Sequence, residues 1–168
     1  WGWLPCGLSA TVLLAAWLGL FDIARVTIGT RGLPRYMAVA LLAGYAWLAL
    51  GGLAWVFVAA GHATRDAALH ALGLGFVFSM VMAHAPVILP AVAGVKLRFS
   101  AAFYVPLALL HGSLLLRLTA GWVATQWLTA GAVLNAAAIG LFALTAVHAA
   151  LTWRHAPTQN FHSRSSTP

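Results

Sequence analysis

Five histidines lie in or beside apolar stretches of the sequence, and their imidazoles are the side chains best suited to chemistry. They are His62, His70, His84, His111 and His148. Ionisable side chains inside a bilayer are costly and usually serve a function. A neutral imidazole is a ligand for haem iron, copper and zinc. The pattern therefore predicts a cofactor-binding or metal-binding site.

The stretch from His70 to Pro86, HALGLGFVFSMVMAHAP, places two of these histidines on one predicted helix. Fourteen residues separate them, which at 100° per residue is about 1400°, within about 40° of four whole turns. Both rings should therefore share a face, and their rise of about 21 Å suits two haems stacked across a bilayer. Gly73 lies on that face, where a missing side chain would admit a porphyrin edge. Pro86 and Pro90 should kink the helix after the second histidine.

Partner ligands must come from other helices, and the depth of each histidine predicts the pairing. His62, His70 and His111 should lie toward the outer side, whereas His84 and His148 should lie nearer the cytoplasm. We therefore expect His70 and His111 as outer haem ligands and His84 and His148 as inner ones. A copper or zinc site made of the three outer histidines is an alternative. Each histidine could instead be a hydrogen-bonding residue that joins two helices.

The composition places these histidines in a membrane protein. The chain has 168 residues, of which 62% are hydrophobic and 7% are charged, whereas soluble domains carry about 25% charged residues. A membrane helix needs about 20 apolar residues. The segments that satisfy this are Leu4–Leu20, Met37–Ala60, Ala67–Val92, Ala101–Leu118 and Val123–Leu151. We predict an all-α integral membrane bundle of about five transmembrane helices over residues 1–152, followed by a polar cytoplasmic tail over 153–168.

The basic residues are distributed unequally between the two ends of these helices. Seven lie in the connections after the first and third segments and in the tail, whereas two, Arg65 and Arg117, lie on the other side. This asymmetry predicts an outer N-terminus and a cytoplasmic C-terminus in the bacterial inner membrane. Arg117 should extend toward the outer surface. The net charge of +7 is accounted for by these clusters, and we expect no nucleic-acid binding.

His70, the residues ALGLGF after it and the proline-containing apolar run resemble a segment of the NnrS-type haem- and copper-containing membrane proteins linked to nitric oxide metabolism. The resemblance covers about 25 residues, from His70 to about Gly94. It implies haem binding at His70 together with His84, and it assigns no role to His111 or His148. NnrS proteins have many more helices, and MAHAPVILPAV is not their usual continuation. The histidine spacing is also similar to that of dihaem cytochrome b.

These features predict a membrane protein that binds haem b and transfers electrons as a subunit of a respiratory or photosynthetic complex, with a quinone as a candidate exchange partner. We expect it to contact the lipid bilayer and to bind other membrane subunits or form a homo-oligomer. The alternatives are a cofactor-free accessory subunit, a copper-binding protein and a (bacterio)chlorophyll-binding protein. A transporter is also an alternative, but Asp22 and Asp66 are the only acidic residues of the chain. This argues against coupling of transport to protons or sodium ions through carboxylates.

Overall fold

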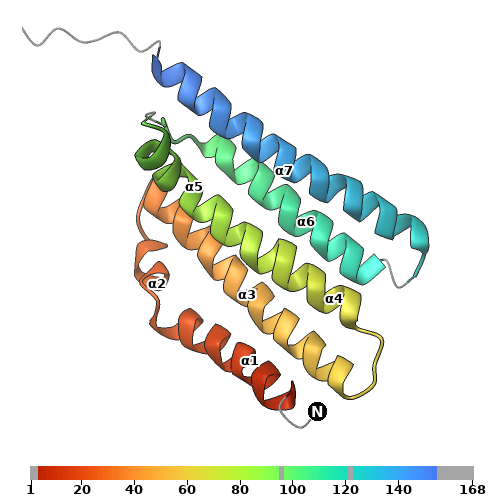
Figure 1. Cartoon of the computed structure of the whole chain (residues 1–168). Coiled ribbons are helices and arrows are strands. Elements are labelled where there is room, and N and C mark those ends of the chain that lie inside the picture. Colours follow the sequence, from red (N-terminus) through yellow and green to blue (C-terminus); the bar gives the residue numbers. More distant parts are fainter. Residues whose placement is uncertain (1–3, 95–96, 121–122, 155–168) are drawn as a thin grey trace, which may run out of the picture.

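The computed structural model describes residues 4–94, 97–120 and 123–154, which form helices joined by short connections (Figure 1). The α-helices are α1 (Leu4–Phe21), α2 (Ala24–Thr27), α3 (Leu33–Ala59), α4 (Arg65–His70), α5 (Phe78–Ala93), α6 (Tyr104–Ala120) and α7 (Thr125–Arg154). A π-helix, η1 (Ala71–Val77), and a 3-10 helix, η2 (Ala101–Phe103), complete the order. The described residues contain no β-strand, so the predicted all-α class is confirmed.

Four helical segments of the described chain are long and apolar enough to cross a membrane. They are Leu33–Ala59, Arg65–Ala93, Ala101–Thr119 and Thr125–Thr152, and each lies within a few residues of a predicted segment. α1 is also apolar, although its scored part, Ser9–Phe21, is shorter. By length and composition the chain is a helical membrane protein. The predicted tail beyond residue 154 lies outside the described residues.

The second of these segments, Arg65–Ala93, is continuous, but its middle is π-helical. The residues that flank η1, His70 and Phe78, keep right-handed helical φ and ψ angles. A π-helix bonds each residue to the fifth one along, so its turn is wider than an α-helical turn, and such turns are rare and frequent at functional sites. α5 then continues through Pro86 and Pro90 and ends at Gly94, which is left-handed with φ of 63°.

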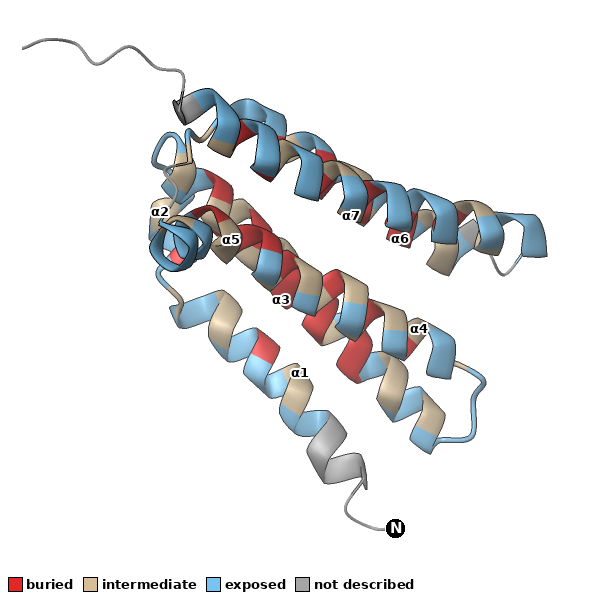
Figure 2. Cartoon of the chain, turned by 45° about the horizontal axis from the view of Figure 1, so that its top comes forward, coloured by how far each residue is buried: buried red, intermediate tan, exposed pale blue. Residues whose placement is uncertain are grey.

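The helices pack as a row in which most neighbours are consecutive in the chain. α1 lies on α3, α3 on the α4–η1–α5 helix, η1 on α6, and α6 on α7 (Figure 1). Short connections favour this antiparallel packing of consecutive helices. The buried residues gather on the inner faces of α3, α5 and α6, whereas α1 and α7 expose much of their surface (Figure 2). This distribution fits outer helices whose free faces contact lipid.

The interior contains two apolar clusters at different levels of the bundle. The larger one joins α3, α5, α6 and α7 through residues that include Tyr36, Met82, Phe103 and Phe142. Tyr36 is fully buried, and its ring meets that of Tyr104 edge-on with centroids 5.3 Å apart. The smaller cluster consists of Trp47, Ala71 and Leu114 from α3, η1 and α6, with partly buried neighbours. The candidate site lies beside this smaller cluster.

Glycine allows α3 and the π-helix to approach closely. A Cβ atom on Gly75 would overlap with the Trp47 side chain, and one on Gly51 would lie 2.7 Å from the Leu72 side chain. Small residues commonly permit such contacts between membrane helices. By contrast, nothing lies within 4 Å of a Cβ built on Gly73. The packing of η1 on α3 therefore depends on Gly75, two residues beyond the glycine singled out in the sequence.

Candidate site around the intramembrane histidines

His70 is the last residue of α4, and its ring is held by Asp66 one turn earlier. The Nδ1 atom lies 2.8 Å from the Asp66 carbonyl oxygen and 3.2 Å from the carboxylate Oδ1. Both oxygens are acceptors, so Nδ1 carries the proton of a neutral ring and Nε2 keeps a free lone pair. The side chain is 28% exposed. His70 can therefore act as a ligand through Nε2.

Asp66 is itself fixed by a cation from another helix. Arg117 of α6 donates from one Nη to both carboxylate oxygens, at 3.1 and 3.3 Å, and from the other Nη to the Leu128 carbonyl of α7 at 3.2 Å. Its side chain is only 14% exposed, and a Cβ on Gly131 would lie 2.8 Å from it. Arg117 thus extends along the protein to the exposed carboxylate of Asp66. Its guanidinium joins three helices because Asp66 and a backbone carbonyl offer it acceptors there.

His84, on α5, repeats the local geometry of His70. Its Nδ1 lies 2.8 Å from the carbonyl oxygen of Met80, which again leaves the Nε2 lone pair of a neutral ring free. The residue is half-buried. The Met80 side chain extends toward α3, where its Cε atom would lie 2.5 Å from a Cβ on Gly44. His70 and His84 thus both present the nitrogen lone pair that a metal or haem iron requires.

His111, on α6, has the opposite arrangement. Its Nδ1 accepts a hydrogen bond of 2.8 Å from the indole N–H of Trp47 on α3, and the two rings are almost parallel, at 12°. An indole nitrogen can only donate, so the neutral His111 ring carries its proton on Nε2. That atom is buried without a hydrogen-bond partner among the described residues. In this tautomer His111 joins helices and has no free nitrogen lone pair for iron.

The remaining predicted residues lie at the periphery. His62 is exposed in the connection after α3, where its ring meets Phe57 edge-on with centroids 5.7 Å apart. His148 is exposed on α7, between buried residues that face α6. Gly73 is also exposed, on η1. Open space at Gly73 is compatible with a flat ligand against that face of the helix.

The hydrogen-bond partners of the predicted histidines differ from one ring to the next. Hydrogen bonds connect His70 to Asp66, His84 to Met80 and His111 to Trp47, so the three rings have separate partners. Across the described ranges, no three side chains of His, Cys, Asp or Glu are placed to hold one metal ion. The π-helix between His70 and His84 also changes the angle between the two side chains around the helix axis. Each residue of a π-helical turn rotates the chain by less than the 100° assumed for an α-helix.

Sequence reasoning missed the residues that orient the histidines. The spacing of Asp66 and His70, four residues apart on a helix, is a signal that could have been used. The partnership of Trp47 with His111 joins residues 64 positions apart, and no local pattern indicates it. Ser113 of α6 donates to the Asn135 side-chain oxygen of α7 at 2.6 Å, so Asn135 forms a polar contact between these two helices.

Comparison with known proteins identifies the family and nothing closer. The chain belongs to the family described as Domain of unknown function (DUF8744), whose model matches residues 1–151. No curated protein and no solved structure gives a significant match. The match spans all the helices up to the last turn of α7, so the family corresponds to the helical bundle as a whole.

Proposed function

We propose that this member of the DUF8744 family is a membrane subunit that binds haem b through His70 and His84 and transfers electrons, with a quinone as an expected exchange partner. The observation that carries the proposal is the state of the two rings. In both, Nδ1 donates to an acceptor on the same helix, and Nε2 is left as the ligand. Histidines that bind metals almost always donate their other ring nitrogen in this way.

Asp66 adds support at the His70 position. A carboxylate that accepts from Nδ1 increases the basicity of Nε2 and fixes the orientation of the ring. Arg117 holds this carboxylate from α6, so the ligand, its acceptor and the cation form a chain across two helices. Haem supplies reversible one-electron chemistry at its iron, and its axial ligands help to set the potential. The protein contributes the oriented imidazoles and an apolar surrounding.

The pairing of ligands that we propose is not the one expected from depth. Trp47 occupies Nδ1 of His111, and His148 lies on the exposed side of α7. We therefore propose that a second axial ligand comes from another copy of the chain or from another membrane subunit. Gly73, exposed one turn beyond His70, leaves room for a planar group on the face of η1.

We also propose five membrane crossings with the N-terminus outside and the C-terminus in the cytoplasm of a bacterial inner membrane. α1 supplies the fifth crossing, since its 18 residues approach the length that a bilayer requires. Arg25 of α2, Arg31, and Arg35 in the first turn of α3 all follow α1 within a short stretch of the chain, and such a cluster favours the cytoplasmic side.

A difference spectrum tests the haem proposal directly. The full chain, purified in mild detergent from haem-producing cells, should show Soret and α bands when its reduced and oxidised spectra are compared. His70→Ala and His84→Ala should each lower the haem content. His62→Ala, at an exposed position, is the matched control and should leave the spectrum unchanged. A folded, colourless protein that also fails to take up added haem would refute the proposal.

A cofactor-free accessory subunit is the second candidate, and the hydrogen bonds favour it in one respect. His70, His84 and His111 each have a partner within the protein, so all three could act only in packing. His111→Leu separates the two proposals when compared with His70→Ala. Haem binding predicts that only His70→Ala lowers the haem content, whereas the accessory subunit predicts no haem in either variant.

A further inference from the structure

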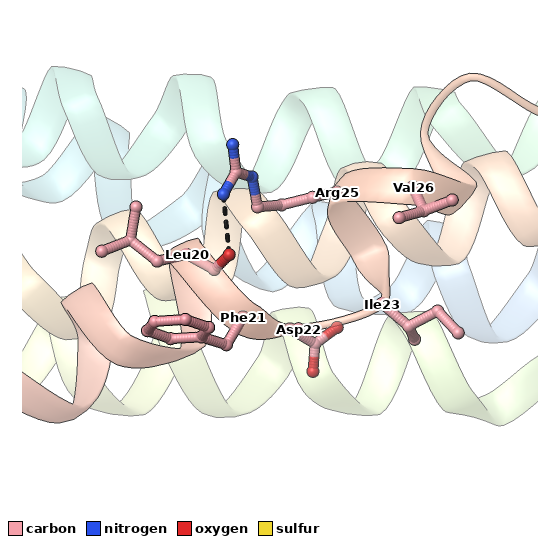
Figure 3. Close-up of a pocket in the computed structure, with 6 residues that line it drawn as sticks. All are labelled: Leu20, Phe21, Asp22, Ile23, Arg25 and Val26. Carbon is pink, nitrogen blue, oxygen red and sulfur yellow. Dashed lines mark hydrogen bonds between the residues drawn. The ribbon is translucent and has the colours of Figure 1, made fainter.

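The corner between α1 and α2 contains an open pocket that the proposed electron transfer does not use. It has a volume of about 560 Å³ and is lined by Leu20, Phe21, Asp22, Ile23, Arg25 and Val26 (Figure 3). This volume lies within the range of small-molecule sites, about 300–1,000 Å³. The lining combines aliphatic and aromatic groups with one guanidinium, which is the pattern that an amphiphile requires.

The apolar part of the lining is turned outward. Phe21 and Ile23 are each 71% exposed, and Val26 is 76% exposed. They lie where α1 ends and the chain turns into the four residues of α2. At the end of a membrane helix, such side chains contact acyl chains close to the headgroup level.

The polar part of the lining is cationic. One Nη of Arg25 donates to the Leu20 carbonyl oxygen at 2.7 Å, and a guanidinium has five N–H donors, so this bond leaves donors for an anion. Arg31 and Arg35 are exposed in the same connection and the first turn of α3. Arg25 is thus followed by two more exposed arginines within ten residues of the chain.

Asp22, the one carboxylate in the lining, is engaged elsewhere. Its Oδ1 accepts from the Ala24 N–H at 2.7 Å, and its side chain hydrogen bonds with Tyr45 of α3. Figure 3 shows its carboxylate and the Arg25 guanidinium pointing to opposite sides of the chain. The carboxylate thus fastens α1 to α3 and leaves the Arg25 side of the pocket positive.

From these features we infer that the α1–α2 corner binds an anionic phospholipid, with the headgroup phosphate at Arg25 and an acyl chain along Phe21, Ile23 and Val26. Basic clusters next to membrane helices attract anionic lipids of the cytoplasmic leaflet. The inference is independent of haem binding. It assigns to this corner the role of a lipid-binding site that ties α1 to the membrane surface.

Native mass spectrometry of the full chain with defined lipids tests the site. Phosphatidylglycerol should be retained in preference to phosphatidylcholine with the same acyl chains. Arg25→Gln should weaken phosphatidylglycerol retention about fivefold, the effect of one cation near an anionic surface. Arg65→Gln, an exposed arginine beyond the other end of α3, is the matched control and should have no effect.

A competition experiment and a second variant complete the test of the lipid site. Inorganic phosphate at millimolar concentration should not displace the lipid, because it lacks the acyl chain; displacement would show a simple anion site and overturn the inference. If Arg25→Gln loses helicity by circular dichroism, the double variant Arg31→Gln and Arg35→Gln replaces it and should also weaken retention. Equal retention of both lipids, or equal effects of Arg25→Gln and Arg65→Gln, would overturn the inference too.

Discussion

At the scale of single residues, the partner of Nδ1 divides the histidines into two kinds. His70 and His84 donate from Nδ1 to oxygen atoms of their own helix, whereas His111 accepts at Nδ1 from the indole of Trp47. The first kind presents a lone pair at Nε2, and the second presents a proton there. The sequence shows three similar imidazoles, and only their neighbours make them chemically different.

The Trp47–His111 bond should contribute measurably to stability. Trp47→Phe keeps an aromatic ring but removes the N–H, and we expect a loss of about 1 kcal/mol in the free energy of unfolding, since hydrogen bonds between membrane helices are modest. Denaturation in mixed detergent micelles measures this loss. A double-mutant cycle with His111→Leu should show that the two losses are not additive.

Trp17→Phe provides the control for that cycle, because Trp17 is 58% exposed on α1. It should change the unfolding free energy little. Additive losses for Trp47→Phe and His111→Leu would mean that the two side chains are not coupled. That result would contradict the Trp47–His111 hydrogen bond and, with it, the placement of the His111 proton on Nε2.

At the scale of elements, glycines allow the close approach of η1 to α3, and Gly75 is the one that lies on η1 itself. Gly75→Ala would push a methyl group into Trp47, and we expect a destabilisation of about 1–3 kcal/mol, typical of overpacking. Gly73→Ala is the matched control on the same π-helix, where a Cβ meets open space. It should be neutral or stabilising by up to about 1 kcal/mol, because alanine is the better helix former.

Thermal unfolding of the two variants in detergent distinguishes these outcomes. If both substitutions had the same effect, the approach of the two helices would not depend on Gly75. The haem spectrum of Gly73→Ala provides a second measurement, since a methyl group there would narrow the face proposed for a planar ligand.

Much of the fold, but little of the site, could be predicted from the sequence. Long apolar runs specify membrane helices because a bilayer leaves few other ways to satisfy the backbone, and the helix Arg65–Ala93 was expected over 67–92. The π-helical turn within it could not be predicted, because it depends on packing against α3. The pairings of Trp47 with His111 and of Arg117 with Asp66 arise from contacts between helices distant in sequence, which periodicity does not report.

At the scale of the whole molecule, the order of the helices predicts which connections share a side of the membrane. With the five crossings and the orientation proposed above, the α1–α3 connection should lie in the cytoplasm and the connection around His62 should lie outside. In a Cys6→Ser background, a cysteine at Thr30 should be labelled by an impermeant maleimide only after the cells are opened. A cysteine at Ala63 should be labelled in intact cells.

Labelling at the same two positions can also contradict the proposed orientation. Labelling of Thr30→Cys in intact cells, or protection of Ala63→Cys, would reverse the orientation. Similar labelling of both would mean that α3 does not cross the bilayer. Thr30 and Ala63 are both exposed. Neighbouring parts of the protein should therefore not prevent the reagent from reaching either cysteine.

The wide turn of η1 also fixes how the two ends of its helix are rotated relative to each other. Deleting one residue between Ala71 and Val77 would favour an ordinary α-helical path, in which the larger advance of about 100° per residue would offset most of the rotation lost with the deleted residue. His84 and the two prolines would then keep nearly the same neighbours, and His70 and its contact with Asp66 would stay in place. The angular offset between the two imidazoles is thus set by the wide turn together with its extra residue, and it differs from the offset that fourteen α-helical residues would give.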